Sequence, residues 1–359
     1  MEQAMTSGLR TASTVLACWI ASLGLVKAAP SGPLQIYFID VEGGQSTLVV
    51  TPEKHTLLID AGWANDGKGF RPGDPHKARD ANRIVAAARD AGVSQIDYLL
   101  ITHFHTDHVG GVSELAQLMP IRGFIDHGAP HPHASETSEE TRDAFALYSA
   151  LLSKGGRHIE PRPGDRLPFD DMEATVVSSA GATLSAPLPG AGAANAGCPK
   201  EAIPAVDRDE NPRSTGVLVR HGKFRFLDVG DLSGQPLFNL VCPKNLVGRV
   251  DAYLTAHHGG ADAAEPATFA ALQPRVVMIN NAVQKGGQRA MFEVLHRAPV
   301  ENVWQLHTSA DAGDINFPAE YVANLDDSNA FWIKLVAKED GSFSVLNART
   351  GQSKQYPAR

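Results

Sequence analysis

ITHFHTDHVGG, residues 101–111, places three histidines and one aspartate within six positions. The apolar stretch DYLLIT at 97–102 leads into it and predicts a buried strand that ends where these side chains begin. In an extended segment His103 and His105 project to the same side of the chain, so both can bind one metal ion. The stretch therefore predicts a metal site at the end of a strand.

The polar residues that follow can bind a neighbouring ion. Asp107 and His108 lie where the chain is expected to turn into a helix, and Gly110 and Gly111 allow that turn to be tight. Neutral imidazole together with carboxylate suits zinc, with manganese as the alternative. We therefore expect two divalent metal ions per chain, Zn²⁺ before Mn²⁺.

The pattern around this stretch recurs in the second half of the chain. STLVVTPEKHTLLIDAG at 46–62 predicts two strands that end in Asp-x-Gly, and VLVRHGKFRFLDVGDL at 217–232 predicts the same. DAYLTAHHGG at 251–260 repeats the acid-initiated apolar strand that runs into histidines. This weak internal duplication predicts an α/β (α+β) fold: a four-layer αββα sandwich of two mixed β-sheets, with both sets of strand ends meeting at one edge.

Helical patterns and loops separate the strands. The stretch 78–92 carries its apolar residues on one helical face, and a long helix with an acidic start is expected at 135–155. We expect a single domain over 34–350, closed by a hairpin at 331–347, with insertions at about 130–165 and 180–213. The second insertion is rich in Ala, Gly and Pro, which is typical of a flexible insert or of a lid over a site.

The second half of the chain contains further candidate ligands. Asp231 follows an apolar strand and a glycine. Taken alone, such an aspartate is more typical of a turn or a helix N-cap, but the duplication and the histidines favour a carboxylate that bridges two metal ions. His257 and His258 end the next strand. The adjacent pair cannot both point the same way, and we expect His257 rather than His258 to complete the second metal site.

Two more residues are expected near the metals. Asp60 ends the pair of strands in the first half, at the place where the segment containing Asp231 ends the pair in the second half. It is predicted to orient a ligand histidine through a hydrogen bond rather than to bind metal. His127 follows a predicted strand 19 residues after His108. It is expected to be the third ligand of the ion held by His103 and His105, with pocket lining as the alternative.

The N-terminus predicts export. A basic residue, the apolar run TASTVLACWIASLGLV and small residues around Ala28 are typical of a secretory signal peptide at 1–28, which would make the protein periplasmic or secreted. A lipid anchor at Cys18 is the weaker alternative. Cys198 and Cys242 could form a disulfide in an exported protein, although the sequence does not place them in contact.

Composition limits the partners. The 359 residues carry a net charge of −8, and no block of Lys or Arg occurs that would predict a nucleic-acid-binding patch. We therefore expect a small-molecule or phosphodiester substrate, with any polyanion attracted by the metal ions.

The motifs LIDAG, THFHTDHVGG, DVGDL and AHHGG occur in an order that resembles the metallo-β-lactamase superfamily of metallohydrolases, over about 34–280. Within it, the pattern from FIDVEGGQSTLVV to AHHGG is most similar to the hydrolase domain of bacterial DNA-uptake competence proteins. Two departures stand out. NNAVQKGGQ at 280–288 replaces a Gly-His-Pro segment, and ENPRS at 210–214 occupies the region of the usual third histidine, for which His127 is the expected substitute.

The resemblance implies an exported hydrolase that uses two metal ions and a metal-bound hydroxide to cleave a phosphodiester or another ester. Asp231 would hold the metal pair, and Asp107 would guide the proton. One alternative keeps the metal site but makes the protein a β-lactamase or lactonase. The other alternative is a metal-binding module without enzymatic activity.

Overall fold

The strands predicted from the duplicated pattern form two β-sheets that share one apolar core between them. The computed structural model describes residues 1, 32–67, 71–133, 138–199 and 209–359. Apart from Met1, the signal peptide predicted at 1–28 and the lipid attachment predicted at Cys18 lie outside these residues. Within the described ranges, no helix combines the length and the apolar character needed to cross a membrane.

The first sheet has nine strands within the described residues, in the order β17-β16-β15-β1-β2-β3-β4-β5-β6. β3 to β6 run parallel, and the other pairs are antiparallel. The predicted closing hairpin is β15 and β16, which bring the end of the chain back beside β1. The strands are β1 (Leu34–Phe38), β2 (Thr47–Val50), β3 (Thr56–Ile59), β4 (Tyr98–Leu100), β5 (Gly123–Ile125), β6 (Arg157–Ile159), β15 (Ile333–Ala337), β16 (Phe343–Asn347) and β17 (Ser353–Tyr356).

The second sheet has eight strands within the described residues, in the order β14-β13-β12-β11-β10-β9-β7-β8. β10 to β14 run parallel, and β7, β8 and β9 pair antiparallel. The strands are β7 (Glu173–Ser179), β8 (Ala182–Thr183), β9 (Gly216–His221), β10 (Phe224–Asp228), β11 (Ala252–Leu254), β12 (Val276–Ile279), β13 (Asn302–His307) and β14 (Val322–Asn324).

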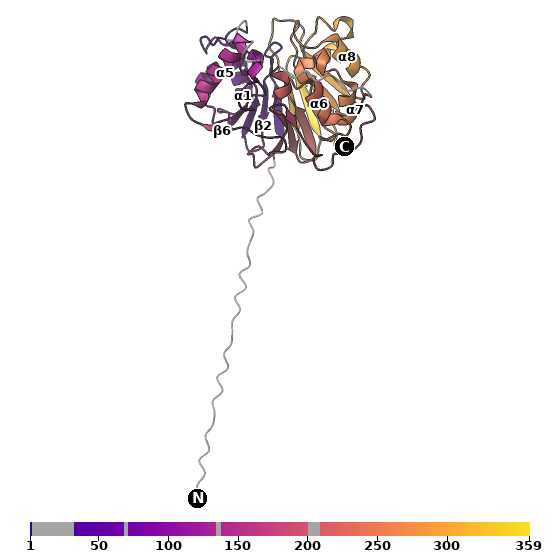
Figure 1. Ribbon diagram of the computed structural model, residues 1–359. Helices are drawn as coiled ribbons and strands as arrows, with labels where there is room; N and C mark the ends of the chain where they lie inside the picture. The colour runs from indigo at the N-terminus through magenta and orange to yellow at the C-terminus, as the bar shows by residue number, and fades with distance from the viewer. Residues whose placement is uncertain (2–31, 68–70, 134–137, 200–208) are drawn as a thin grey trace.

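Helices cover the outer face of each sheet (Figure 1). The α1, α3 and α5 helices pack on the first sheet, and α6, α7 and α8 pack on the second. This arrangement confirms the predicted αββα sandwich of two mixed sheets. The helices are α1 (Arg79–Asp90), α2 (Thr106–Val109), α3 (Val112–Leu118), α5 (Glu139–Leu152), α6 (Gly234–Val241), α7 (Pro266–Leu272) and α8 (Arg289–Leu295).

The second predicted insertion is partly held against the end of α6 by a covalent bond. Cys198 and Cys242 form a disulfide with their Cα atoms 5.8 Å apart. The segment 188–195 also exchanges backbone hydrogen bonds with 243–246, including those from Leu188 and Gly192 N–H. The described part of this insertion is therefore fixed against its neighbours, and Asp209 and Asn211, which follow the undescribed residues 200–208, line the candidate site.

The core between the sheets brings together alternate side chains of both. Phe38 of β1 and Phe226 of β10 lie edge to face, with ring centroids 5.6 Å apart, and both are buried. Period-two alternation explains this contact, because Phe224 and Phe226 point to the inner core while Leu227 points to the outer helices. The aromatic pair therefore connects the two halves of the duplication.

Phe226→Ala is expected to lower the free energy of unfolding by about 3–5 kcal/mol, because it leaves a cavity between the sheets. Chemical denaturation followed by circular dichroism measures this change. Leu147→Ala is the matched control, since Leu147 is an exposed residue of α5, and it should change stability by less than about 0.5 kcal/mol. Equal effects of the two substitutions would contradict the placement of Phe226 in the core.

The topology also positions the reactive residues. β3 and β4 are parallel neighbours, as are β10 and β11, so each pair ends at the same edge of its sheet. Asp60 and the motif at 101–111 follow the first pair, and Asp231 and His258 follow the second. Because the two sheets face each other across one core, both sets of residues meet at one end of the sandwich.

Candidate metal centre

The first two histidines of the motif lie just after β4 with their ring nitrogens close together. His103 Nε2 lies 3.0 Å from His105 Nδ1 and 3.8 Å from Asp231 Oδ2. One ligand atom from each of these three residues lies within 4.8 Å of the other two. His103 is buried, and the hydroxyls of Thr102 and Ser214 lie 3.1 and 3.4 Å from its Nδ1, which leaves Nε2 to the site.

A second group of four buried side chains lies beside the first. His108 Nε2 and His258 Nε2 each lie 3.2 Å from Asp231 Oδ2, and His258 Nε2 also lies 3.2 Å from Asp107 Oδ2. One ligand atom from each of the four residues falls within 4.8 Å of the others. Asp231 belongs to both groups, so its carboxylate occupies the position expected of a bridge between two ions.

The atoms of these groups fit a metal centre. His108 Nε2, His258 Nε2 and Asp231 Oδ1 are buried and have no hydrogen-bond partner within the described residues. A buried polar atom without a partner costs about 1–3 kcal/mol. Divalent cations bound to these atoms would remove that cost, and a donor set of imidazole nitrogens and carboxylate oxygens suits zinc.

Neighbouring side chains orient the two buried imidazoles. His108 Nδ1 lies 2.7 Å from Asp60 Oδ2, and Thr102 donates to the same carboxylate from both its N–H and its hydroxyl. Asp60 thus has the position predicted for an orienting carboxylate. On the other side, Asn280 Nδ2 lies 3.1 Å from Nδ1 of His258. In both rings Nδ1 is held, so Nε2 faces the site.

The structure places His258, rather than the expected His257, in the second group of candidate ligands. Both residues have left-handed backbone, with φ of 50° and 53°, inside the turn Ala256–Gly259. This turn points His258 inward, where it is 1% exposed, and leaves the side chain of His257 one-third exposed with its Nδ1 2.9 Å from Asp262. His257 Nε2 still lies 3.8 Å from Asp231 Oδ2, at the edge of the site.

His127 does not join the group formed by His103 and His105. Its Nε2 lies 3.1 Å from Glu210 Oε2, and its ring packs edge to face on Phe104. The reason is topological, since β5 lies one strand further from the centre of the sheet than β4, and its end faces the cover provided by α5. The structure therefore does not place His127 beside His103 and His105, where it was expected as the third ligand, but against Glu210.

Asp209 is a site residue that the sequence did not single out. Its Oδ1 lies 3.1 Å from His105 Nε2, on the far side of that ring from His103. Burial lowers the pKa of His105, but the hydrogen bond that its ring makes to Asp209 and the negative charges of Asp107, Asp209 and Asp231 together raise the pKa above its ordinary value. Asp209 directly precedes ENPRS, the segment that occupies the region of the usual third histidine. This position in the sequence could have identified Asp209 as a site residue.

Lys285 is the second such residue. Its Nζ contacts Asp107 Oδ2 and lies 4.6 Å from the centre of the Trp63 ring. Gly286, with φ of +68°, lies so close to His258 that a Cβ there would be 2.5 Å from the Cβ of that histidine. The Gly-Gly pair after Lys285 could have identified this residue from the sequence, because two glycines let the loop pass directly over the site.

Burial and mutual charge shift the pKa values of the cluster. Burial alone would raise the pKa of Asp107, but His108 and Lys285 hold it well below its usual range. In Asp231 the effect of burial is likewise outweighed by His108 and His258, and its pKa is also well below the ordinary value. Both carboxylates are therefore ionised, which is the form that binds a metal ion.

Three members of the two groups, His105, Asp107 and Asp231, line a cleft of about 630 Å³. Trp63 and Lys285 form one side, His257 and Asp209 another, and the carboxylates of Asp107 and Asp231 line it as well. The volume is in the range of small-molecule sites, roughly 300–1,000 Å³. The cleft thus gives a small substrate access to both ligand groups.

Asp228 is a buried acid behind the site whose titration affects stability. Burial raises its pKa to about 7, even though Gly230 N–H and Gln45 Nε2 donate to its Oδ1. Between about pH 4 and 7 the folded state keeps this proton while the unfolded state releases it. The free energy of unfolding should therefore fall as pH rises through this window, by up to about 4 kcal/mol.

Asp228→Asn is expected to flatten this pH dependence in metal-free protein, because an amide cannot ionise and its oxygen can accept the same two hydrogen bonds. Urea denaturation of both proteins at pH 4.5 and 7.5 measures the difference. The variant should gain stability relative to the native protein at the higher pH. Parallel pH profiles of the two proteins would show that Asp228 does not titrate in this window.

Comparison with known proteins finds relatives for part of the chain. A model of the metallo-beta-lactamase superfamily matches residues 39–194, a range that contains the motif at 101–111. Hydroxyacylglutathione hydrolases of Pseudomonas putida strains F1 and KT2440 are 31% and 30% identical over 151 residues, which is 41% of this chain and 55% of each relative. The chain thus spans about half the length of the curated relatives it matches.

Among solved structures, the chain is similar to Igni18, a metallo hydrolase from the archaeon Ignicoccus hospitalis. The two are 14% identical, with a TM-score of 0.40, and the match covers 75% of this chain and 94% of that one.

Proposed function

We infer that this chain, whose residues 39–194 match a model of the metallo-beta-lactamase superfamily, hydrolyses an ester-type bond with the help of two divalent metal ions. The observation that carries this proposal is the shared carboxylate: Asp231 lies in both groups of candidate ligands. A buried aspartate shared by two groups of imidazoles would suit a pair of adjacent divalent ions. Zn²⁺ is proposed first and Mn²⁺ second, on the donor chemistry.

Bound metal ions would supply a water nucleophile near neutral pH and polarise the scissile bond. The residues of the chain have separate tasks around them. His103, His105, His108 and His258 would bind the ions through ring nitrogens, and the shared Asp231 carboxylate would hold both ions. Asp107 is ionised and lines the cleft, so it would bind metal or guide the proton of the attacking water by a hydrogen bond. Asp60 keeps the ring of His108 in place.

We propose a phosphodiester as the first substrate class. The support is the motif order, which resembles the hydrolase domain of DNA-uptake competence proteins, and a metal pair able to neutralise a phosphate. A thioester is the second candidate, supported by the 31% identity to a hydroxyacylglutathione hydrolase. A lactam or lactone is the third.

The test is hydrolysis of bis(p-nitrophenyl) phosphate by the purified chain with Zn²⁺ or Mn²⁺, beside a hydroxyacylglutathione thioester and a chromogenic cephalosporin. Metal-dependent turnover of the first compound supports the phosphodiester class. Turnover of only the thioester or the cephalosporin moves the assignment to that class. No turnover of any compound by protein with two bound ions would contradict the hydrolase proposal for these classes.

Lys285 is expected to attract the negative charge of the substrate. It is a half-exposed cation in the cleft, next to Asp107, whose charge the metal ions would neutralise. Lys285→Gln should raise KM for an anionic substrate by roughly tenfold, as expected for loss of one charge-assisted contact, with kcat nearly unchanged. Lys338→Gln, outside the cleft lining, is the matched control and should leave KM unchanged. An equal KM for a neutral ester before and after substitution separates this effect from misfolding.

We also propose that the chain is exported and that 34–350 forms a single domain. The N-terminal pattern supports export, and the bond between Cys198 and Cys242 is typical of oxidising compartments. Fractionation of the native host followed by N-terminal sequencing tests the first proposal, with mature protein expected to begin after Ala28. A single cooperative unfolding transition is expected for the second.

A further inference from the structure

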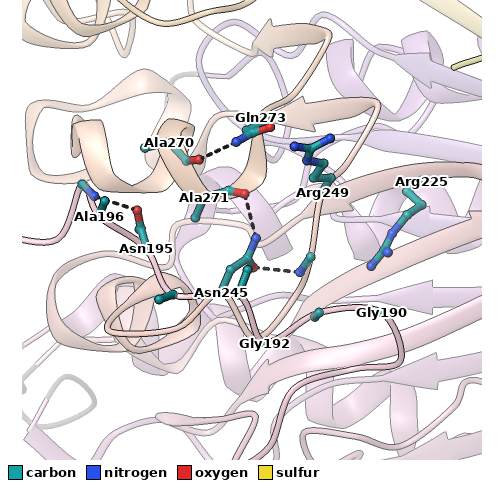
Figure 2. A pocket seen from close by; sticks show the side chains of 15 residues that line it. Gly190, Gly192, Asn195, Ala196, Arg225, Asn245, Arg249, Ala270, Ala271 and Gln273 are labelled. Atoms are coloured by element: carbon teal, nitrogen blue, oxygen red, sulfur yellow. Dashed lines mark hydrogen bonds between the residues drawn. The ribbon is translucent and has the colours of Figure 1, made fainter.

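A cavity of about 440 Å³ lies on the outer face of the second sheet, away from the metal centre. It is bounded by the segment 190–197, by the end of α7 and by the start of β10, as Figure 2 shows. Glycine and alanine make up most of its lining, so its walls are largely backbone and short side chains. The volume is that of a small-molecule site.

Two arginines, Arg225 and Arg249, line this cavity, and none of its lining residues is acidic. This local charge contrasts with the net charge of −8 of the whole chain. Neither arginine forms a salt bridge with a described residue within 4.0 Å, although other arginines, such as Arg275 with Glu301, are paired. Two unpaired guanidinium groups in one concave site favour an anion there.

Arg225 is held in place but keeps free donors. Its Nη2 donates to the carbonyl of Val247, and its Nε is buried without a hydrogen-bond partner. A Cβ at Gly248 would lie 3.2 Å from both Nη atoms, so glycine there allows the guanidinium to lie against the backbone. Asp251 accepts from the backbone N–H of Arg225 rather than from its guanidinium. The side chain therefore has donor capacity that no described acid uses.

The arginines are not needed to cap the end of α7. The carbonyl of Ala271 accepts from Asn245 Nδ2, and that of Ala270 accepts from Gln273 Nε2. Both carbonyls that line the cavity at this helix end are thus satisfied by neutral amides, as the dashed lines in Figure 2 show. A role as helix C-caps does not account for the two cations.

The opposite wall is fixed before any ligand binds. Asn195 donates to the carbonyls of Val241 and Ala267 and accepts from Gly197 N–H. The disulfide between Cys198 and Cys242 closes the same segment. A wall held at several points loses little conformational entropy on binding, which favours a specific ligand site.

We propose that the cavity lined by Arg225 and Arg249, the arginine pocket, binds the phosphate group of a small molecule. Two guanidinium groups match the charge of a phosphate dianion, and arginine presents its donors to phosphate oxygens in pairs. The remaining volume, lined by neutral residues, accommodates the uncharged part of a phosphate ester. The arginine pocket is thus a second binding site, independent of the proposed hydrolysis.

The arginine pocket is separated from the metal centre by the length of a strand. Arg225 is the second residue of β10, and Asp231 lies three residues beyond the other end of that strand. At about 3.3 Å per residue, Arg225 and Asp228 alone are about 10 Å apart. The residues that line the arginine pocket and those that line the metal cleft do not overlap.

Equilibrium dialysis of labelled inorganic phosphate against the metal-loaded full chain tests the proposal. The double variant Arg225→Gln/Arg249→Gln is compared with Lys77→Gln/Arg89→Gln, which removes two exposed charges from the other half of the molecule. Phosphate bound at the metal ions contributes equally to all proteins. The native chain and the control should show an additional class of sites that the arginine variant binds at least tenfold more weakly.

Competition identifies the ligand. If adenosine monophosphate competes at lower concentration than inorganic phosphate, the arginine pocket takes a phosphate ester. If the two compete equally, it takes the free phosphate ion. Both results support the proposal. Citrate that competes as well as phosphate would overturn the phosphate assignment. Equal phosphate binding by the native chain and the arginine variant, or no binding beyond the metal centre, would overturn the pocket itself.

Two further measurements separate this proposal from misfolding and from the proposed function. Arg249 is exposed, so Arg249→Gln alone should fold normally and still weaken phosphate binding several-fold. Metal content and basal hydrolysis of the double variant should equal those of the native chain. If none of the proteins hydrolyses any tested compound but phosphate still binds to the arginine pocket, the proposed function is contradicted and the arginine pocket is not.

Discussion

Asp231→Ala is expected to remove hydrolytic activity and bound metal together. The Asp231 carboxylate belongs to both groups of candidate ligands, with Oδ2 3.2 Å from Nε2 of His108 and of His258. Losing a shared ligand removes several kcal/mol of transition-state stabilisation, so kcat/KM should fall by roughly a thousandfold or more. Metal analysis by plasma mass spectrometry should find that the variant has lost at least one of two ions.

Asp262→Ala is the matched control for this experiment. Asp262 is a half-exposed carboxylate that lies 2.9 Å from His257 Nδ1 but outside both ligand groups. Its removal should leave both ions bound and should lower kcat/KM by no more than roughly tenfold, the lower range for an outer hydrogen-bond partner. An Asp231 variant that keeps two ions and native activity would refute the bridging role of this residue.

His258→Ala is expected to have the second-largest effect. His258 is buried with Nε2 within 3.2 Å of both Asp107 and Asp231, whereas His257 lies at the edge of the cleft. Loss of His258 should therefore release one ion and lower kcat by roughly a hundredfold or more. His257→Ala should keep both ions and lower kcat by less than roughly tenfold.

The pair of variants distinguishes the two histidines directly. Metal content and kcat measured on the same preparations give the answer, with circular dichroism to verify the fold. Loss of metal in the His257 variant, with metal retained in the His258 variant, would restore the preference that the sequence alone suggested. Loss of metal in both would mean that the turn at 256–259 rearranges when ions bind.

Much of the fold could be predicted from the sequence because its signals are local. Alternation of apolar residues identified the strands around the motif and around the Asp-x-Gly turns, and the duplication identified two equivalent halves. Parallel neighbours β3–β4 and β10–β11 then required both sets of strand ends to lie at one edge. The strands β6, β7, β8, β14 and β17 were not predicted, because none of them contains more than two large apolar residues in a row.

The site was predictable in part, for the same reason. His103 and His105 are two residues apart in extended chain, so their common direction follows from strand geometry. The choice between His257 and His258 depended on two consecutive left-handed residues, a conformation that non-glycine sequences rarely signal. His127 was misplaced because its direction depends on what packs beside β5.

Asp209 and Lys285 illustrate the remaining limit. Each reaches the site from a loop separated by about a hundred residues or more from the side chain it contacts, His105 and Asp107 respectively. No periodicity within either loop indicates such a contact. The pairing of Arg225 with Arg249 in one cavity is a comparable case, since neither arginine belongs to a recognisable motif.

The sequence by itself determined the two-sheet sandwich, the edge at which the chemistry lies and the metal-binding character of the motif. These follow from alternation, duplication and the spacing of donor atoms along a few residues, all of which are written locally in the chain. Only the tertiary structure decided that His258 turns inward, that His127 holds Glu210, and that Asp209 and Lys285 complete the cleft. Those outcomes depend on backbone turns and on contacts between distant loops, which are set by the packing of the whole molecule.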